Sequence, residues 1–223
     1  MSFSLRAQAA FGVVLLVVCN LATIGLIHRA KSTSLDGARE MEQHFTLLKD
    51  KVVPLGTLIK NVQIDVIQVQ QFLQDIAATR GQDGLDGGFE EAAKFAASFI
   101  RDVASARAIA VDLGRDDLRT GLDGAAAAFA EFYRVGREMA EAYVAGGPSA
   151  GNPMMPDFDE RSEAMGSSLE ALLAIRDKMI EGSVTGIGAD VAGVEESISQ
   201  TALVTSLAAL FATLGLLTAA WAF

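Results

Sequence analysis

The 223-residue sequence has few of the residues on which several classes of protein depend. It contains one cysteine, two histidines and four prolines, and aromatic residues make up 7% of the chain. A single cysteine excludes an intramolecular disulfide bond, and the two histidines, His28 and His44, lie too far apart in sequence to suggest a metal cluster. The shortage of aromatic residues and of β-branched clusters disfavours a β-sandwich or an enzyme barrel. Alanine-rich runs favour helices instead.

Motifs for catalysis and for phosphate binding are also missing. The sequence contains no G-x-x-x-x-G-K-[ST], G-x-G-x-x-G, G-x-S-x-G or H-E-x-x-H pattern. With 28 acidic residues, close pairs of carboxylates arise by chance, and we interpret nearly all of them as parts of solvated helix faces. We therefore predict no enzymatic activity, catalytic residue, bound metal or cofactor. The net charge of −10 disfavours nucleic acid as a partner, because its phosphates would be repelled.

Charged and apolar residues are segregated along the chain, whose mean hydropathy is +0.32. Residues 7–27 and 201–223 carry no charge, and each stretch has about the 20 residues that a transmembrane helix needs. The first stretch could also be a cleaved signal peptide, a lipoprotein signal or a buried core helix. Its apolar core is longer than that of a signal peptide. A lipoprotein signal has a small residue before its cysteine, whereas bulky Val18 precedes Cys19 here. A buried core helix would show a polar stripe, which this stretch lacks. We therefore predict a retained span.

Two spans would place residues 28–200 on the opposite side of the membrane from both ends of the chain. Flanking charge does not set the orientation, because Arg6 opposes Arg29 and Lys31. The acidic character of the middle segment suits the outside of a bacterial inner membrane. We expect a multi-pass protein of that membrane with cytoplasmic residues 1–6, transmembrane helices at 7–27 and 201–223, and a periplasmic domain at 28–200.

Apolar residues in the middle segment recur at alternating spacings of three and four, which is typical of helices packed side by side. Four such stripes occur, at Leu58–Ile76, Phe89–Leu113, Leu118–Tyr143 and Leu169–Ile198. The last stripe is predicted to contain Leu169, Leu173, Arg176, Ile180, Val184, Ile187, Val191, Val194 and Ile198. We predict an all-α fold, a membrane-anchored antiparallel four-helix bundle whose long first and last helices continue into the two transmembrane helices. Its four-helix part covers about 55–175, and a loop is expected from Gly146 to Pro156.

The inner helices, about 89–113 and 118–145, are much shorter than the outer helices, about 28–80 and 157–200. They can therefore accompany only the distal part of the outer helices. The remaining stalk would have two helices per chain, with a kink near Pro54. Two helices bury little apolar surface by themselves, so we predict a homodimer.

Several polar residues stand out on these stripes. The segment Gln63–Arg80 carries neutral glutamines, Arg107 lies beside the second stripe, and Arg176 falls within the fourth. A guanidinium directed into a helical bundle can hold a carboxylate, nitrate or phosphate with two hydrogen bonds. Alternatively its stem packs while its head reaches water or a nearby aspartate. The candidate ligand-binding residues are Gln70, Asp75, Arg80 and Arg107.

Two segments carry a resemblance to a known family. Val62–Gly81, which includes the run QVQQFLQDIAATRG, and Met139–Asn152, followed by Phe158-Asp159, resemble the sensor regions of bacterial methyl-accepting chemotaxis proteins. The resemblance implies a homodimer whose periplasmic bundle binds a small molecule, an anion or a solute-binding protein. Binding would shift the last helix and its span. Trp221 is similar to the aromatic anchors that such families place at the membrane interface.

In that family a linker domain and a methylated hairpin pass the signal to a cytoplasmic kinase complex. Neither element occurs before Phe223. The chain is therefore expected to be the N-terminal part of a longer polypeptide, whose C-terminal part would contact the kinase complex. Two other interpretations stay open. The same segment could precede a histidine kinase or a cyclic-dinucleotide cyclase, or it could be a structural membrane-anchored coiled coil without a ligand.

Overall fold

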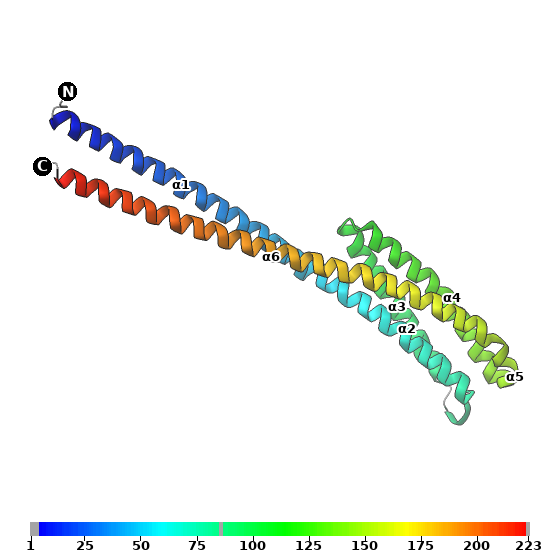
Figure 1. Ribbon diagram of the computed structural model, residues 1–223. Coiled ribbons are helices and arrows are strands. Elements are labelled where there is room, and N and C mark those ends of the chain that lie inside the picture. The colour runs from blue at the N-terminus through cyan, green and yellow to red at the C-terminus, as the bar shows by residue number, and fades with distance from the viewer. Residues whose placement is uncertain (1–4, 85–86, 222–223) are drawn as a thin grey trace. The chain divides into compact units, whose positions relative to one another are not determined.

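The computed structural model describes residues 5–84 and 87–221, and the described chain is all-α, without a strand (Figure 1). Side chains are described for all of these residues except 5–11, 15, 16, 19, 83 and 216–221. The chain divides into two compact units. The core unit is Thr46–Ser183, and the helix-pair unit consists of Met1–Phe45 and Val184–Phe223. The prediction of an all-α fold is confirmed.

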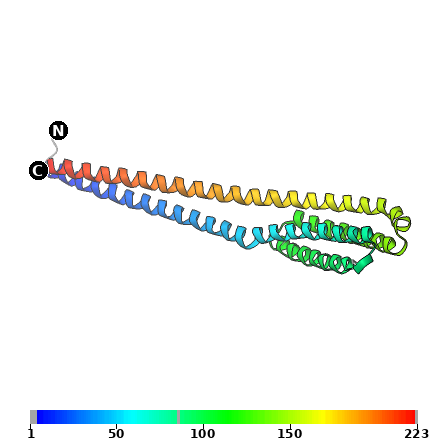
Figure 2. The ribbon, with the colours of Figure 1, turned by 90° about the horizontal axis from the view of Figure 1, so that it is seen from below.

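Four helical segments supply the core of the core unit. They are α2 (Val53–Thr79), α3 (Gly88–Asp112), α4 (Asp116–Gly146) and the first part of α6 (Met155–Trp221), as Figures 1 and 2 show. Most of each stripe predicted for α3 and α4 is buried, and the end residues Phe89, Leu113 and Tyr143 are half-buried. The buried members are Ala92, Ala96, Phe99, Val103, Ala106 and Ala110 of α3, and Leu118, Leu122, Ala125, Phe129, Phe132, Gly136 and Met139 of α4. Alternating spacings of three and four therefore identified the inner face of both helices correctly.

Aromatic side chains join the helices at the centre of this unit. Phe99 of α3 stacks on Phe129 of α4 with ring centroids 3.8 Å apart, and Phe132 of α4 stacks on Phe158 of α6 at 5.5 Å. Phe132 and Phe158 are fully buried. Burial of one such ring contributes about 1.5–3 kcal/mol, so these contacts fix how α4 packs against its neighbours.

The first helix is interrupted where the sequence predicts a kink. A π-helical turn, Leu48–Val52, separates α1 (Leu5–Leu47) from α2, and Pro54 lies in the first turn of α2. Proline has no N–H to donate, and its ring clashes with the carbonyl group four residues earlier. A widened π turn relieves that clash, which explains its position directly before Pro54.

The connection between α4 and α6 is helical, so the predicted loop is wrong. Gly147, with φ of 65° and ψ of −158°, ends α4, and Pro148 begins the one-turn helix α5 (Pro148–Gly151). A 3₁₀ turn (Asn152–Met154) follows, and α6 starts at Met155. Proline is favoured at the first position of a helix, where no N–H is needed. The Gly-Gly-Pro sequence therefore breaks one helix and starts the next.

The buried stripe of α6 differs from the predicted one. Leu169 is buried as expected, but Leu173 and Arg176 are half-buried and Ile180 is exposed. The side chains that α6 buries instead are Phe158, Met165, Leu169, Leu172 and Met179. Both stripes have helical spacing, and the packing of α6 against α2 and α4 selects the one with the larger side chains.

In the helix-pair unit, α1 and the second part of α6 lie side by side (Figures 1 and 2). The hydroxyls of Ser34 and Ser197 are 2.8 Å apart, and His44 Nδ1 lies 2.5 Å from an Asp190 carboxylate oxygen. A Cβ atom on Gly37 would lie 3.3 Å from a methyl group of Val194. Small and polar residues thus contribute to the seam between the two helices, together with Val194.

Within the described residues, one helical stretch, Pro148–Gly215, is long and apolar enough to cross a membrane. Its apolar end exposes large side chains, including Leu203, Leu210 and Phe211. The backbone of the other predicted span, 7–27, is helical within α1, but several of its side chains lie outside the description. The side chain of Trp221, the predicted interface anchor, also lies outside it.

Candidate functional site

The candidate residues from the sequence do not form a single site. A Cβ atom on Gly88 would lie 2.7 Å from the Ile76 side chain, so α3 starts beside the end of α2. Lys51, just before α2, pairs with Asp112 at the end of α3, with an N–O distance of 2.6 Å. Because α2 and α3 are antiparallel, Arg107 lies about 29 Å from the start of α3, measured along the helix at 1.5 Å per residue. Arg80 and Arg107 are therefore at opposite ends of the unit.

The two remaining candidates, Gln70 and Asp75, lie on α2 before Arg80 in sequence. Asp75 is exposed and precedes Arg80 by less than two helical turns, whereas Gln70 is half-buried and farther back. The Asp75 carbonyl accepts a hydrogen bond from the Thr79 hydroxyl at 2.9 Å. Asp75 is therefore the candidate nearest to Arg80 along α2, and Gln70 lies farther from it.

Arg80 occupies a distinctive position at the end of α2. Its backbone is left-handed, with φ of 57°, and its N–H donates to the Ile76 carbonyl at 2.7 Å. Its Nη1 lies 3.0 Å from the point that a Cβ atom of Gly147 would occupy. The guanidinium thus lies over the C-terminal end of α4, where the helix dipole favours positive charge. Within the part of the chain that the structure describes, no carboxylate forms an ion pair with Arg80.

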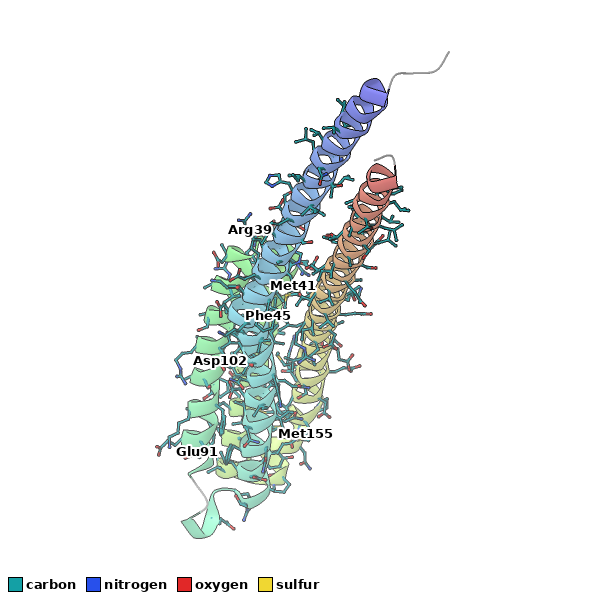
Figure 3. All side chains as sticks on the ribbon, turned by 90° about the vertical axis from the view of Figure 1, so that its left-hand side faces the viewer. Arg39, Met41, Phe45, Glu91, Asp102 and Met155 are labelled. Atoms are coloured by element: carbon teal, nitrogen blue, oxygen red, sulfur yellow. The ribbon has the colours of Figure 1, made fainter. Side chains whose placement is uncertain are left out.

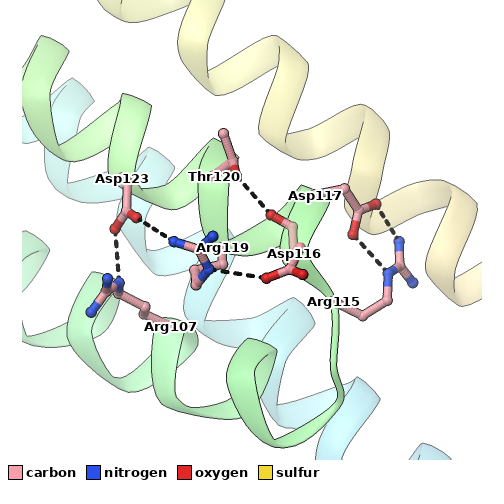
Figure 4. Close-up of polar contacts among 7 residues, drawn as sticks. All are labelled: Arg107, Arg115, Asp116, Asp117, Arg119, Thr120 and Asp123. Atoms are coloured by element: carbon pink, nitrogen blue, oxygen red, sulfur yellow. Dashed lines mark hydrogen bonds and ion pairs between the residues drawn. The ribbon is translucent and has the colours of Figure 1, made fainter.

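Arg107, in contrast, already has a carboxylate partner. Its Nε atom lies 2.8 Å from an oxygen of Asp123 on α4, as Figure 4 shows. Arg119 reaches Asp116 at 3.2 Å and the other oxygen of Asp123 at 3.4 Å. These contacts tie α3 to α4 near the turn between them. An anion at Arg107 would have to compete with Asp123.

The same turn holds a second ion pair. Arg115 donates two hydrogen bonds to the Asp117 carboxylate, at 2.9 and 2.7 Å (Figure 4). These bonds lower the pKa of Asp117 to about 2, and they raise the pKa of Arg115. Asp117 also lies in the first turn of α4, where negative charge is favourable. The cluster stabilises the turn that follows Gly114, which has a positive φ of 64°.

Arg176 is also satisfied within the chain. Its guanidinium lies 2.7 Å from a carboxylate oxygen of the adjacent Asp177, and its Cδ would be 3.9 Å from a Cβ atom on Gly56 of α2. The stem packs against α2 and the head reaches an aspartate, which is the second of the two interpretations given above for such arginines.

The structure distinguishes one residue of the polar segment Gln63–Arg80 that is not among the four candidate ligand-binding residues. The Asp65 side chain of α2 is 4% exposed, and its Oδ2 atom is buried without a hydrogen-bond partner. Burial raises its pKa, opposed by a hydrogen bond from Ser98 of α3. The available signal was its spacing, because Asp65 follows Val62 by three positions and precedes Val69 by four.

Comparison with protein-family models, curated proteins and solved structures finds no match to the chain. Among the described residues, no group of three or more histidine, cysteine, aspartate or glutamate side chains is placed to hold a metal ion. The case for a function therefore rests on α6 and on Arg80.

Proposed function

We propose that the chain is the sensing end of a membrane-anchored signal transducer of the chemoreceptor type, which binds a small periplasmic solute. One observation carries the proposal. Helix α6 supplies core residues from Phe158 to Met179 and continues without a break into the apolar segment from Thr201. In the proposal a small displacement of α6 in the core unit is passed along this helix to its apolar end.

The exposed apolar side chains of the helix-pair unit support membrane anchoring. Leu203, Leu210 and Phe211 of α6 are 61, 56 and 63% exposed, and Val13 and Leu21 of α1 are 63 and 64% exposed. Such a surface is unfavourable in water and favourable in hydrocarbon. In the proposal both helices cross the inner membrane, and the acidic core unit faces the periplasm.

Arg80 supports a small anionic solute as the ligand. Among the arginines discussed above it is the one whose guanidinium has no carboxylate partner in the described chain, and in the proposal its donors bind the anion. A planar guanidinium matches the geometry of carboxylate, nitrate and phosphate. The site would include Asp75 if the ligand also carries an amine.

A stripe on α2 supports the homodimer. Ile64, Ile67, Gln71 and Gln74 share one exposed face of the helix at spacings of three and four, and Ile64 and Ile67 are 42 and 52% exposed. Neutral polar and apolar residues on an exposed face are typical of an interface rather than of a solvated surface. In the proposal a second copy of the chain covers this stripe.

The experiment is a thermal-shift screen of the full chain in lipid nanodiscs against organic acids, amino acids, nitrate and phosphate. We expect at least one compound to raise the unfolding midpoint, and we expect Arg80→Ala to remove that shift. Arg134→Ala is the matched control, because Arg134 is an exposed arginine paired with Glu131 and Glu138. Arg134→Ala should leave the shift unchanged.

Two results would contradict the proposal in different ways. If no compound raises the midpoint, ligand sensing by this chain loses its support. If a compound raises the midpoint equally in wild type and in Arg80→Ala, sensing stands but Arg80 is not part of the site.

A further inference from the structure

The core unit contains a buried carboxyl group that the proposed function does not use. Asp65 is 4% exposed, and it lies on α2 among the buried side chains Val62, Val66 and Val69. Its Oδ2 atom is buried and has no hydrogen-bond partner. Burial of an ionised carboxylate without a partner is so unfavourable that such groups take up a proton instead.

The side chains that act on Asp65 come from the facing helix α3. A hydrogen bond from Ser98 favours the ionised carboxylate, Asp102 disfavours it and Arg101 favours it. The two charged groups from α3 oppose each other, because one is negative and the other is positive (Asp102 is labelled in Figure 3). Neither neutralises Asp65 through an ion pair, so burial remains the largest influence.

We propose that the Asp65 carboxyl group is a proton-binding site that couples the packing of α2 against α3 to pH. A protonated Asp65 is neutral and can stay between Val62 and Val69 with α3 packed over it. An ionised Asp65 must be hydrated, and water reaches it only if α2 and α3 separate locally. This site is independent of ligand binding at Arg80 and of membrane anchoring.

The direction of the pH effect follows from linkage. The pKa of Asp65 is raised in the folded chain above its ordinary value of 3.8. Folding therefore favours proton uptake, and the contribution of Asp65 to stability is complete below about pH 4. It is lost as the pH rises through the folded-state pKa. Where the group titrates, the equilibrium constant for local opening rises by up to tenfold per pH unit.

The test compares wild type with Asp65→Asn, which replaces the protonated carboxyl group by an uncharged group of the same shape. Amide hydrogen exchange is measured for α2 and α3 in the full chain in nanodiscs from about pH 4 to pH 8. The ratio of protection in wild type to protection in Asp65→Asn, taken at each pH, cancels the intrinsic pH dependence of exchange. We expect this ratio to fall as the pH rises. Glu160→Gln, which removes an exposed carboxylate outside α2 and α3, is the control and should show the same fall relative to Asp65→Asn as wild type.

A ratio that is constant, or that rises with pH, would overturn the proposal, because Asp65 would then be ionised and stabilised in the folded chain. If Asp65→Asn fails to fold, infrared spectroscopy of wild type decides instead. A protonated-carboxyl band that persists above the pH at which exposed carboxyls ionise supports the site, and its absence refutes it.

Discussion

Gly136 offers a quantitative test of how tightly α4, α2 and α6 pack. A Cβ atom at this position would lie 2.7 Å from a ring carbon of Phe158 and 2.8 Å from a methyl carbon of Leu73. Normal contacts between carbon atoms are about 3.5–4.0 Å, so both side chains would have to move by about 0.7 Å or more. Both are fully buried, and Phe158 is also stacked on Phe132. Gly136→Ala therefore forces strain into the core.

Gly124 is the matched control on the same helix, because a Cβ atom there would meet nothing within 4 Å. Replacing an exposed helical glycine by alanine stabilises by about 1 kcal/mol. At Gly136 the same gain is opposed by about 1–3 kcal/mol of overpacking. Gly124→Ala should raise the unfolding midpoint by about 2–4 °C. Gly136→Ala should leave it unchanged or lower it by up to about 8 °C.

The assay is near-ultraviolet circular dichroism of the tyrosines in the full chain. The chain has two tyrosines, Tyr133 and Tyr143, and both lie on α4 in the core unit. Trp221, in the helix-pair unit, also absorbs in this range, so the measurements use a Trp221→Phe background, in which the tyrosine signal reports unfolding of the core unit. Equal increases in the midpoint for Gly136→Ala and Gly124→Ala would refute the packing described here.

Two further predictions concern the charged turn and the helix pair. Because the pKa of Asp117 is lowered from 3.8 to about 2, its contribution to stability is present above pH 3.8 and is lost as the pH falls toward 2. In a plot of the unfolding midpoint against pH, Asp117→Asn should reduce the fall of the midpoint at acid pH. An unchanged fall would mean that the ion pair between Asp117 and Arg115 does not stabilise the fold. In a Cys19→Ala background, Ser34→Cys with Ser197→Cys should form an intramolecular disulfide on oxidation, because the two hydroxyls are 2.8 Å apart. Crosslinks between chains alone, or none, would contradict the pairing of α1 with α6.

Sequence periodicity identified α3 and α4 well because the largest side chains of each helix fall on one stripe. In α3 the large side chains Phe99 and Val103 alternate with alanines on the buried face, and the exposed side mixes charged residues with Ile100 and Val111. Helix α6 has apolar residues on two neighbouring faces, one with Leu172 and Met179 and another with Ile180 and Val184. The spacing of apolar residues in the sequence does not distinguish two such faces. Which of the two faces is buried depends on tertiary packing. The prediction therefore failed on α6.

The candidate site was harder to predict than the fold. An arginine near an apolar stripe looks the same in sequence whether it pairs with a distant aspartate, as Arg107 does with Asp123, or lies over the end of another helix, as Arg80 does. The distinction depends on which residue of the neighbouring helix lies opposite the arginine. The spacing of apolar residues within one helix does not predict how two helices are aligned along their length. Asp65 shows the same limit, because the burial of an aspartate depends on the helix that covers it.

Cysteine accessibility tests most directly whether α6 runs from a periplasmic core unit into the membrane. In a Cys19→Ala background, Ser149→Cys lies in the exposed turn at α5, and Ser206→Cys lies in the apolar part of α6, where the serine is exposed in the isolated chain. A charged, membrane-impermeant maleimide is applied to intact bacterial cells that express each variant. We predict labelling of Ser149→Cys in intact cells, and labelling of Ser206→Cys only after the membrane is dissolved in SDS. Labelling of Ser206→Cys in intact cells at the rate of Ser149→Cys, or no labelling of Ser149→Cys, would contradict it.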